Sequence, residues 1–312
     1  MILALAGGVG GAKLAAGLAR LLGADLTVVV NTGDDFEYLG LRISPDLDTV
    51  MYTLAGLNNT QTGWGLAGET WSFMDMMERL GGETWFRLGD HDLAIHVERT
   101  RRLANGEALS SVTAALCERL GVKARIVPMS DDPVRTIVHT DEGELAFQHY
   151  FVRRHCEPIL KSLRFEGAEH ASLSAWFSAA LDDPSLQGIV ICPSNPYLSI
   201  GPILALKDAE RRLRKRRAPA VAVSPIIAGS ALKGPAAKIM QELGKTPGAA
   251  EVARGYRGLI DGFVLDEQDA GLARELSAEG LRTLVTETIM RDTASAAVLA
   301  ERVLALLSDL GH

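Results

Sequence analysis

A glycine-rich segment directly follows the first apolar run of the chain, Ile2–Ala6. It reads Gly7, Gly8, Val9, Gly10, Gly11, Ala12, Lys13. The order strand, glycine turn, helix points backbone N–H groups and a helix N-terminus at an anion such as phosphate. We therefore expect Gly7, Gly8, Gly10, Gly11 and Lys13 to bind a diphosphate. We also expect a bulkier side chain at Gly10 to block the anion without unfolding the protein.

Neither standard phosphate-binding pattern fits this segment. A P-loop would have glycine and Ser/Thr on either side of the lysine, where the chain has Ala12 and Leu14. A dinucleotide-binding fingerprint would have its third glycine where Lys13 stands. Two interpretations stay open: a diphosphate site of a less common type, and a tight turn without a ligand.

Carboxylates gather after the second apolar strand. Asp34 and Asp35 come first, and Asp46 and Asp48 follow Ser44-Pro45. Hard oxygen ligands beside a phosphate site favour Mg²⁺, and no His or Cys stands among them to favour zinc. We expect Asp34, Asp35 and Asp46 to hold magnesium.

Asp46 and Asp48 also fit an ordinary helix start. Ser44 is a suitable N-cap, Pro45 is favoured at the first helical position, and the helix dipole stabilises acidic side chains in the first turn. On an ideal helix, side chains two positions apart diverge by about 200°, so this pair cannot share one face. Both a structural and a functional role therefore stay open for the pair.

Alternating apolar strands and helices surround these motifs. Strands are expected over 2–5, 26–30, 188–191, 220–223, 262–265 and 283–285, and a final helix over 293–309. This pattern predicts an α/β fold, a doubly wound, mostly parallel, Rossmann-like sheet that binds ligands at the carboxyl ends of its strands. Residues 46–120 suggest helices and 124–152 an antiparallel meander. We expect one domain over 1–312, with an inserted cap over about 44–160.

Composition narrows the class of protein. The chain has 312 residues, 47% of them hydrophobic, and a net charge of −7, which argues against nucleic-acid and membrane-surface binding. The basic run 211–217 is interpreted as a solvated helix face. Three scattered cysteines argue against a disulfide framework and a structural zinc. We see no signal peptide and no membrane-spanning run, and expect a cytoplasmic protein. A homodimer is compatible with the sequence.

A set of motifs resembles the 2-phospho-L-lactate transferase family of coenzyme F420 biosynthesis, nearly end to end. The motifs cover 7–13, 29–35, 44–50, 88–94, 128–133, 193–196 and 224–229. The resemblance implies transfer of a phospho-lactyl or phospho-enolpyruvyl group to the ribityl hydroxyl of the 5-deazaflavin Fo. The donor would be the three-carbon acid linked to guanosine diphosphate, and the products GMP and F420-0 or its dehydro form.

The resemblance also implies roles for single residues. Ser194, Asn195 and Ser224 would join the glycine segment and Lys13 in holding the donor. Asp48 and Arg87 would contact Fo, with Asp48 and Asp46 as the catalytic candidates and Asp48 accepting the hydroxyl proton. The aromatic cluster Trp64, Trp71, Trp85 and Phe86 would serve as core or as a stacking wall for the deazaflavin.

Two other classes of function stay open for this chain. A Rossmann-type oxidoreductase needs an acidic residue closing the second strand to bind a ribose, and Asn31 stands there instead. A non-catalytic nucleotide sensor needs the glycine segment without the acidic cluster.

Overall fold

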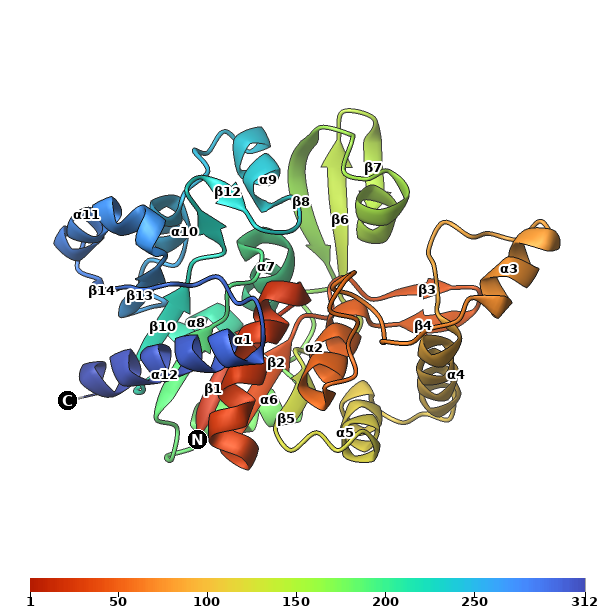
Figure 1. Ribbon diagram of the computed structural model, residues 1–312, viewed down its shortest axis with the longest axis horizontal. Helices are drawn as coiled ribbons and strands as arrows, with labels where there is room; N and C mark the ends of the chain where they lie inside the picture. The colour runs from red at the N-terminus through yellow and green to blue at the C-terminus, as the bar shows by residue number, and fades with distance from the viewer. Residues whose placement is uncertain (312) are drawn as a thin grey trace.

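A parallel sheet forms the centre of the molecule in the computed structural model, which describes residues 1–311. Within that range seven strands lie in the order β14-β13-β10-β9-β1-β2-β5 (Figure 1). They are β1 (Ile2–Ala6), β2 (Leu26–Val30), β5 (Arg125–Pro128), β9 (Gly188–Ile191), β10 (Ala220–Val223), β13 (Gly262–Leu265) and β14 (Arg282–Val285). The predicted doubly wound parallel sheet is confirmed.

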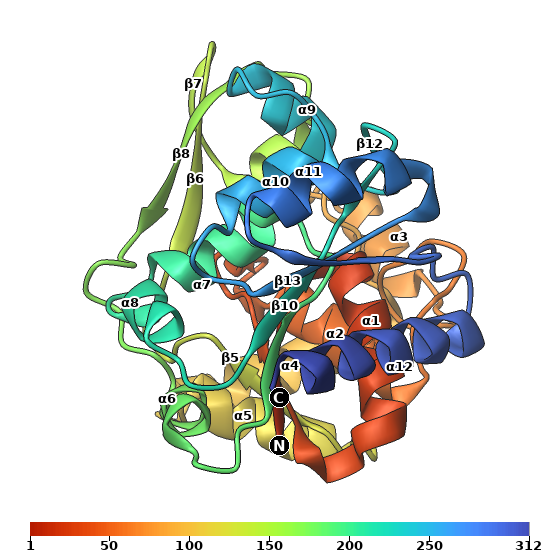
Figure 2. The same ribbon diagram turned by 90° about the vertical axis from the view of Figure 1, so that its left-hand side faces the viewer.

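Helices bury both faces of this sheet. Ala4 and Ala6 of β1 pack into the core of one face, while Leu3 and Leu5 pack into the core of the other. The first face is covered by α1 (Gly8–Leu22), α2 (Pro45–Ala55), α5 (Leu109–Arg119) and α12 (Thr293–Leu310). The second is covered by α6 (Ala175–Asp182), α7 (Gly201–Ala205), α8 (Ala209–Arg214), α9 (Ala236–Glu242), α10 (Ala249–Gly255) and α11 (Ala273–Ala278) (Figure 2). Burial on both faces explains why the strands are apolar throughout.

The chain reverses its winding between β1 and β9. These strands are neighbours, yet the helix after β1 packs on one face and α7, after β9, packs on the other. Loops leaving the carboxyl ends of two such strands diverge and open a crevice between them, where ligands of doubly wound sheets bind. The glycine segment and the loop after β9 therefore meet at this switch point.

Residues 46–120 are mostly helical, as predicted. They include α2, α3 (Ser72–Arg79), α4 (Asp90–Ala104) and α5, and the hairpin of β3 (Phe36–Tyr38) and β4 (Leu41–Ile43) projects together with α3 from the side of the molecule (Figure 1). The meander predicted over 124–152 is wrong in part. Residues 125–128 pair with β2 at the edge of the central sheet. The antiparallel sheet instead consists of β6 (Arg135–Thr140), β7 (Gly143–Ala146) and β8 (Leu160–Glu166).

Short elements complete the described range. They are the 3₁₀ turns Gly23–Asp25 and Glu267–Leu272, the π turns η2 (His149–Arg153) and η3 (Pro196–Ile200), and the small hairpin of β11 (Ile226–Ile227) and β12 (Ser230–Ala231). Among residues 1–311, no helix is long and apolar enough to cross a membrane. Arginines of the basic run pair with acidic side chains. Arg211 and Arg214 are exposed, as predicted for a solvated face, whereas Arg212 and Arg216 are mostly buried.

Candidate functional site

The first turn of α1 is built from the glycine segment itself. The helix begins at Gly8, whose φ of +63° favours glycine, and Gly7 is its N-cap. The Gly7 N–H donates to Ser194 Oγ (3.1 Å), and the Gly8 N–H donates to Asp46 Oδ1 (2.8 Å). Among the described residues, the N–H groups of Val9 and Gly10 have no acceptor. Helix N–H groups left unpaired in this way can bind an anion.

Two of the glycines are needed for packing within the protein. A Cβ at Gly10 would collide with the backbone carbonyl oxygen of Pro193, and a Cβ at Gly11 with Ser194 Oγ. These glycines let α1 approach the loop after β9. A bulkier residue at Gly10 should therefore strain the fold as well as block an anion, which the sequence alone did not indicate.

Gly10→Ala should destabilise the protein by about 2 kcal/mol, because the backbone carbonyl it meets cannot move aside cheaply. Gly255→Ala is the matched control, since Gly255 is also helical and has nothing within 4 Å of its Cβ position. Helix propensity alone would make both substitutions stabilising. Chemical denaturation of the two variants measures the difference; equal stability would show that Gly10 does not limit the packing of α1.

Asp34 and Asp46 form a buried pair of repelling carboxylates beside this turn. Asp46 Oδ2 accepts from Asn31 Nδ2 (3.0 Å), and Asp34 Oδ1 accepts from Thr136 Oγ1 (3.3 Å). Burial, followed by the charge of Asp46, raises the pKa of Asp34 well above its usual range. Burial raises the pKa of Asp46 to about 6, against the hydrogen bonds from Asn31 and Gly8. Two buried carboxylates without a neighbouring cation suit a divalent metal ion.

Asp35 faces away from that pair. Its Oδ2 accepts from Ser44 Oγ (2.7 Å), so Ser44 supports Asp35 and does not cap α2 with its side chain. Its Oδ1 is buried without a partner, and burial raises the pKa of Asp35 to about 7. Asp35 lines a cavity of about 500 Å³ between the β3–β4 hairpin, the end of α4 and the 131–135 loop. It is the only predicted site residue that lines this cavity.

Asp35→Asn should stabilise the metal-free protein at about pH 8. Since the folded-state pKa of about 7 lies above the ordinary value of 3.8, ionisation of Asp35 favours the unfolded chain, and stability falls as the pH rises between these values. The variant should not lose stability in this way. Its free energy of unfolding should exceed that of the parent by about 2 to 4 kcal/mol above pH 7, and the two should agree near pH 4. Urea unfolding at both pH values tests this. A variant less stable than the parent at pH 8 would mean that the carboxylate has a stabilising partner.

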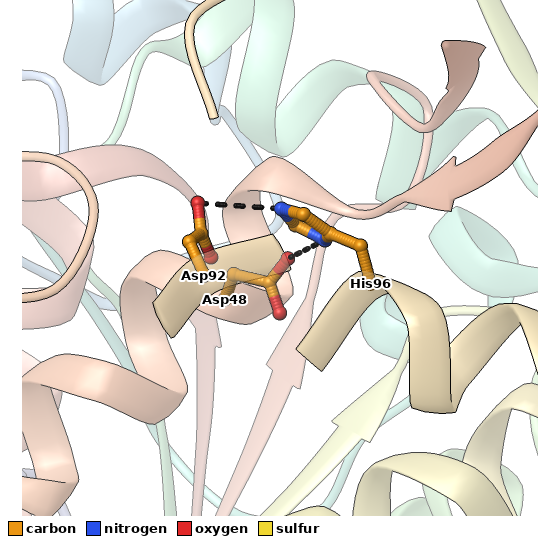
Figure 3. A group of neighbouring side chains, drawn as sticks. All are labelled: Asp48, Asp92 and His96. Atoms are coloured by element: carbon orange, nitrogen blue, oxygen red, sulfur yellow. Dashed lines mark ion pairs between the residues drawn. The ribbon is translucent and has the colours of Figure 1, made fainter. Parts of the chain in front are cut away.

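Asp48 points to the opposite side of α2, toward α4, as the helical angle predicts. It forms a buried ion pair with Arg99, whose Nη1 donates to Asp48 Oδ2 at 3.0 Å. His96 lies between Asp48 (3.7 Å) and Asp92 (3.3 Å), as Figure 3 shows. The Tyr52 hydroxyl donates to Asp92. Burial opposes a charge on Asp92, but the neighbouring His96, the Tyr52 hydroxyl and the Arg99 charge lower the pKa of Asp92 below the ordinary value.

This second cluster is an ion-pair network and not a metal centre. Asp48, Asp92 and His96 are the one group in residues 1–311 whose ligand atoms lie within 4.8 Å of one another. The Arg99 guanidinium already occupies the space beside them, with Nη1 3.2 Å from His96 Nδ1. Asp34, Asp35 and Asp46 do not converge in this way. Asp34 and Asp46 interact by charge and pair with no cation among the described residues, whereas Asp35 bonds to Ser44 and Asp48 pairs with Arg99.

The other predicted donor contacts are partly engaged within the protein. Lys13 Nζ donates to the Met290 carbonyl (2.7 Å). Asn195 accepts from the Tyr197 and Leu198 N–H groups. Ser224 Oγ bonds to the backbone of Ile226. Ser194 supports the Gly7 N–H, so these polar side chains shape the crevice from the protein side.

The predicted aromatic cluster divides into two groups. Trp85 and Phe86 pack on Phe36 and Tyr38 within a small core. Trp64 and Trp71 form a separate, half-exposed pair, with ring centroids 6.3 Å apart. The Arg87 guanidinium stacks on the Trp71 ring at 4.3 Å. This second group can offer a flat surface to a heteroaromatic ring.

Sequence reasoning missed two cations of the site. Arg99 carried no motif, because its contact with Asp48 joins residues far apart in the chain. Lys233 follows the 224–229 motif at the end of the β11–β12 hairpin, and its charge acts on Lys13. The Gly234-Pro235 turn after it was the available signal for an exposed loop.

Known proteins resemble this chain over its whole length. Residues 2–303 match the sequence model of a family described as 2-phospho-L-lactate transferase CofD. A phosphoenolpyruvate transferase from Streptomyces griseus is 40% identical over 316 residues, covering 99% of both chains. A 2-phospho-L-lactate transferase from Methanopyrus kandleri is 41% identical over 311 residues, covering 98% of this chain and 97% of its own. The crystal structure of a UPF0052-family protein from Bacillus halodurans shares the fold, with a TM-score of 0.62 at 14% identity, over 97% of this chain and 98% of that one.

Proposed function

The chain belongs to the 2-phospho-L-lactate transferase family, and on that premise we propose which transfer it performs. It moves a phospho-lactyl or phospho-enolpyruvyl group from a guanosine-diphosphate-linked donor to the ribityl hydroxyl of Fo, releasing GMP in coenzyme F420 biosynthesis. The observation that carries the proposal is the pairing of opposite charges at the switch point. Unpaired N–H groups lie in the first turn of α1, with Lys13 one turn further on, and two buried carboxylates lie beside the same turn, where Asp46 accepts from the Gly8 N–H.

The donor diphosphate is proposed to bind across this first turn. The Val9 and Gly10 N–H groups and the helix dipole attract its phosphates, and Lys13 adds a charge one helical turn further on. Ser194 fixes Gly7, and Asn195 and Ser224 hold the loops after β9 and β10. These three residues thus position the donor site from behind.

Asp34 and Asp46 would hold magnesium between protein and diphosphate. Their repulsion and raised pKa values fit a site that needs a cation. Magnesium would neutralise phosphate charge and fix the phosphates for in-line attack. Asn31 orients Asp46 through its amide, while its carbonyl oxygen accepts from the Gly33 N–H. With these groups engaged, Asn31 is poorly suited to the ribose-binding role that an oxidoreductase needs.

The acceptor is proposed to lie on the other side of the crevice, toward the Trp64–Trp71 pair and Arg87. Asp48 can accept the hydroxyl proton only after Arg99 releases it, because its carboxylate is held in a buried ion pair. Asp46 faces the diphosphate side directly and has a pKa near neutrality. We therefore propose Asp46 as the principal catalytic aspartate and Asp48 as a residue that holds the acceptor side in place.

Arg87→Ala should weaken Fo binding about fivefold to tenfold, since it removes a stacked cation beside an exposed aromatic pair. GDP affinity should stay unchanged. Arg125→Ala is the matched control, because Arg125 stacks on Trp176 at 4.2 Å, away from the crevice. Titration of Fo fluorescence measures both variants. Lost GDP binding with intact Fo binding would move Arg87 to the donor side.

The mass of the product tests the proposed reaction. Purified protein is incubated with Fo, magnesium and either the lactyl or the enolpyruvyl donor. Both donors are tried because a relative named 2-phospho-L-lactate transferase is 41% identical to the chain and one named phosphoenolpyruvate transferase is 40% identical. We expect one donor to yield F420-0 or dehydro-F420-0 together with GMP. Binding of NAD(P) with no product from either donor would favour an oxidoreductase. GDP binding without any turnover would favour a nucleotide sensor.

A further inference from the structure

The β11–β12 hairpin places a second lysine beside the first turn of α1. Lys233 is exposed and donates to the carbonyl oxygen of Thr62 at 3.4 Å. The Cβ position of the next residue, Gly63, meets both Lys233 Nζ and, at 3.6 Å, a methyl group of Val9. One ammonium group therefore lies where segment 58–63, the hairpin and the start of α1 come together.

The two lysines at this place lack a counter-charge. Neither Lys13 nor Lys233 forms an ion pair with any described residue, and each ammonium group donates to a backbone carbonyl. Burial, followed by the charge of Lys233, lowers the pKa of Lys13. Two cations close enough to repel each other, beside unpaired helix N–H groups, are stabilised when an anion with more than one charge binds between them.

We propose that Lys233 is a further ligand of the donor diphosphate. Until the donor binds, the Thr62 carbonyl holds the Lys233 ammonium group near the site. This inference rests on the proposed function and extends it to a residue outside the glycine segment. A neutral carbonyl at 3.4 Å is a weak partner, and a phosphate oxygen replaces it with a charge-assisted bond.

The same exchange links the two substrates. Thr62 lies two residues before Trp64, whose ring packs on Trp71 below Arg87, on the proposed acceptor side. When Lys233 turns to the donor, segment 58–63 loses its tie to the hairpin. Donor binding therefore changes the affinity for Fo, and by thermodynamic reciprocity Fo changes the affinity for the donor.

Calorimetry with GDP, GMP and guanosine on Lys233→Met tests the contact. We expect GDP affinity to fall about tenfold while guanosine affinity stays unchanged, because guanosine carries no phosphate. Lys233→Arg should retain most of the GDP affinity. Lys161→Met, at an exposed lysine of β8, is the matched control. Equal GDP affinity in Lys233→Met and the parent would overturn the inference, whereas a parent that does not bind GDP would instead overturn the proposed donor.

Fo titrations with and without saturating GDP test whether Lys233 couples donor binding to Fo binding. In the parent we expect GDP to change Fo affinity severalfold, and in Lys233→Met we expect the two Fo affinities to agree. The same GDP effect in both proteins would show that Lys233 does not connect the substrates.

Discussion

Asp46→Asn is expected to lower kcat on the order of 100-fold, since it removes a negative charge from the place where the donor phosphates and their cation meet. Asp34→Asn should have a similar effect, because Asp34 is buried close enough for the charge of Asp46 to raise its pKa. The fold should survive, since removing either charge relieves repulsion between buried groups. Steady-state kinetics at increasing magnesium concentration measures the loss, and thermal unfolding shows whether the variants are folded.

Asp25→Asn is the control for Asp46→Asn. Asp25 is exposed in the 3₁₀ turn Gly23–Asp25, which precedes β2 and so lies at the opposite end of that strand from the crevice. We expect parental activity from it. If the Asp46 and Asp34 variants kept the parental magnesium curve, both carboxylates would be helix-start or structural residues.

Arg99→Leu is expected to destabilise the protein by about 3–5 kcal/mol, because it leaves the Asp48 carboxylate buried without a partner. Asp48→Leu should cost a similar amount by leaving the Arg99 guanidinium unpaired. The double variant should be more stable than either single variant, since it buries no unpaired charge. Urea unfolding of the four proteins completes the cycle. Additive losses would mean that the two side chains do not form a pair.

This cycle also decides how Asp48 can be tested as an Fo contact. Asp48→Ala would combine any loss of Fo binding with unfolding, because Arg99 loses its partner. The double variant removes that complication. If it binds Fo as the parent does, Asp48 has a structural role only; if Fo binding is lost and GDP binding is kept, Asp48 contacts the acceptor.

The strands and the switch point could be predicted because parallel strands buried on both faces leave a continuous apolar signal. The sequence also placed Asp34 and Asp46 near α1, since strand ends in a parallel sheet share one edge. Residues 125–128 were assigned to the meander because a short edge strand has the same apolar pattern in an antiparallel meander and at the edge of a parallel sheet. The start of α1 at Gly8 was missed, since glycine disfavours helices unless packing demands it, as Pro193 does here.

The site contacts that could not be predicted join segments that are far apart in the sequence. That Asp48 meets Arg99, and that Ser44 supports Asp35 where a cap was expected, depends on how α4 and the β3–β4 hairpin pack on α2. Local spacing carries no information on such packing. Lys233 and Lys13 are brought together by the sheet order, which places the loop after β10 near α1.

The opposed charges around the first turn of α1 can be tested by one calorimetric comparison, of GDP binding to the parent protein with and without magnesium. If Asp34 and Asp46 share a cation with the diphosphate, magnesium should strengthen GDP binding at least tenfold, because without it the carboxylates repel the phosphates. Equal GDP affinity in magnesium and in EDTA would contradict a metal–diphosphate site at this turn.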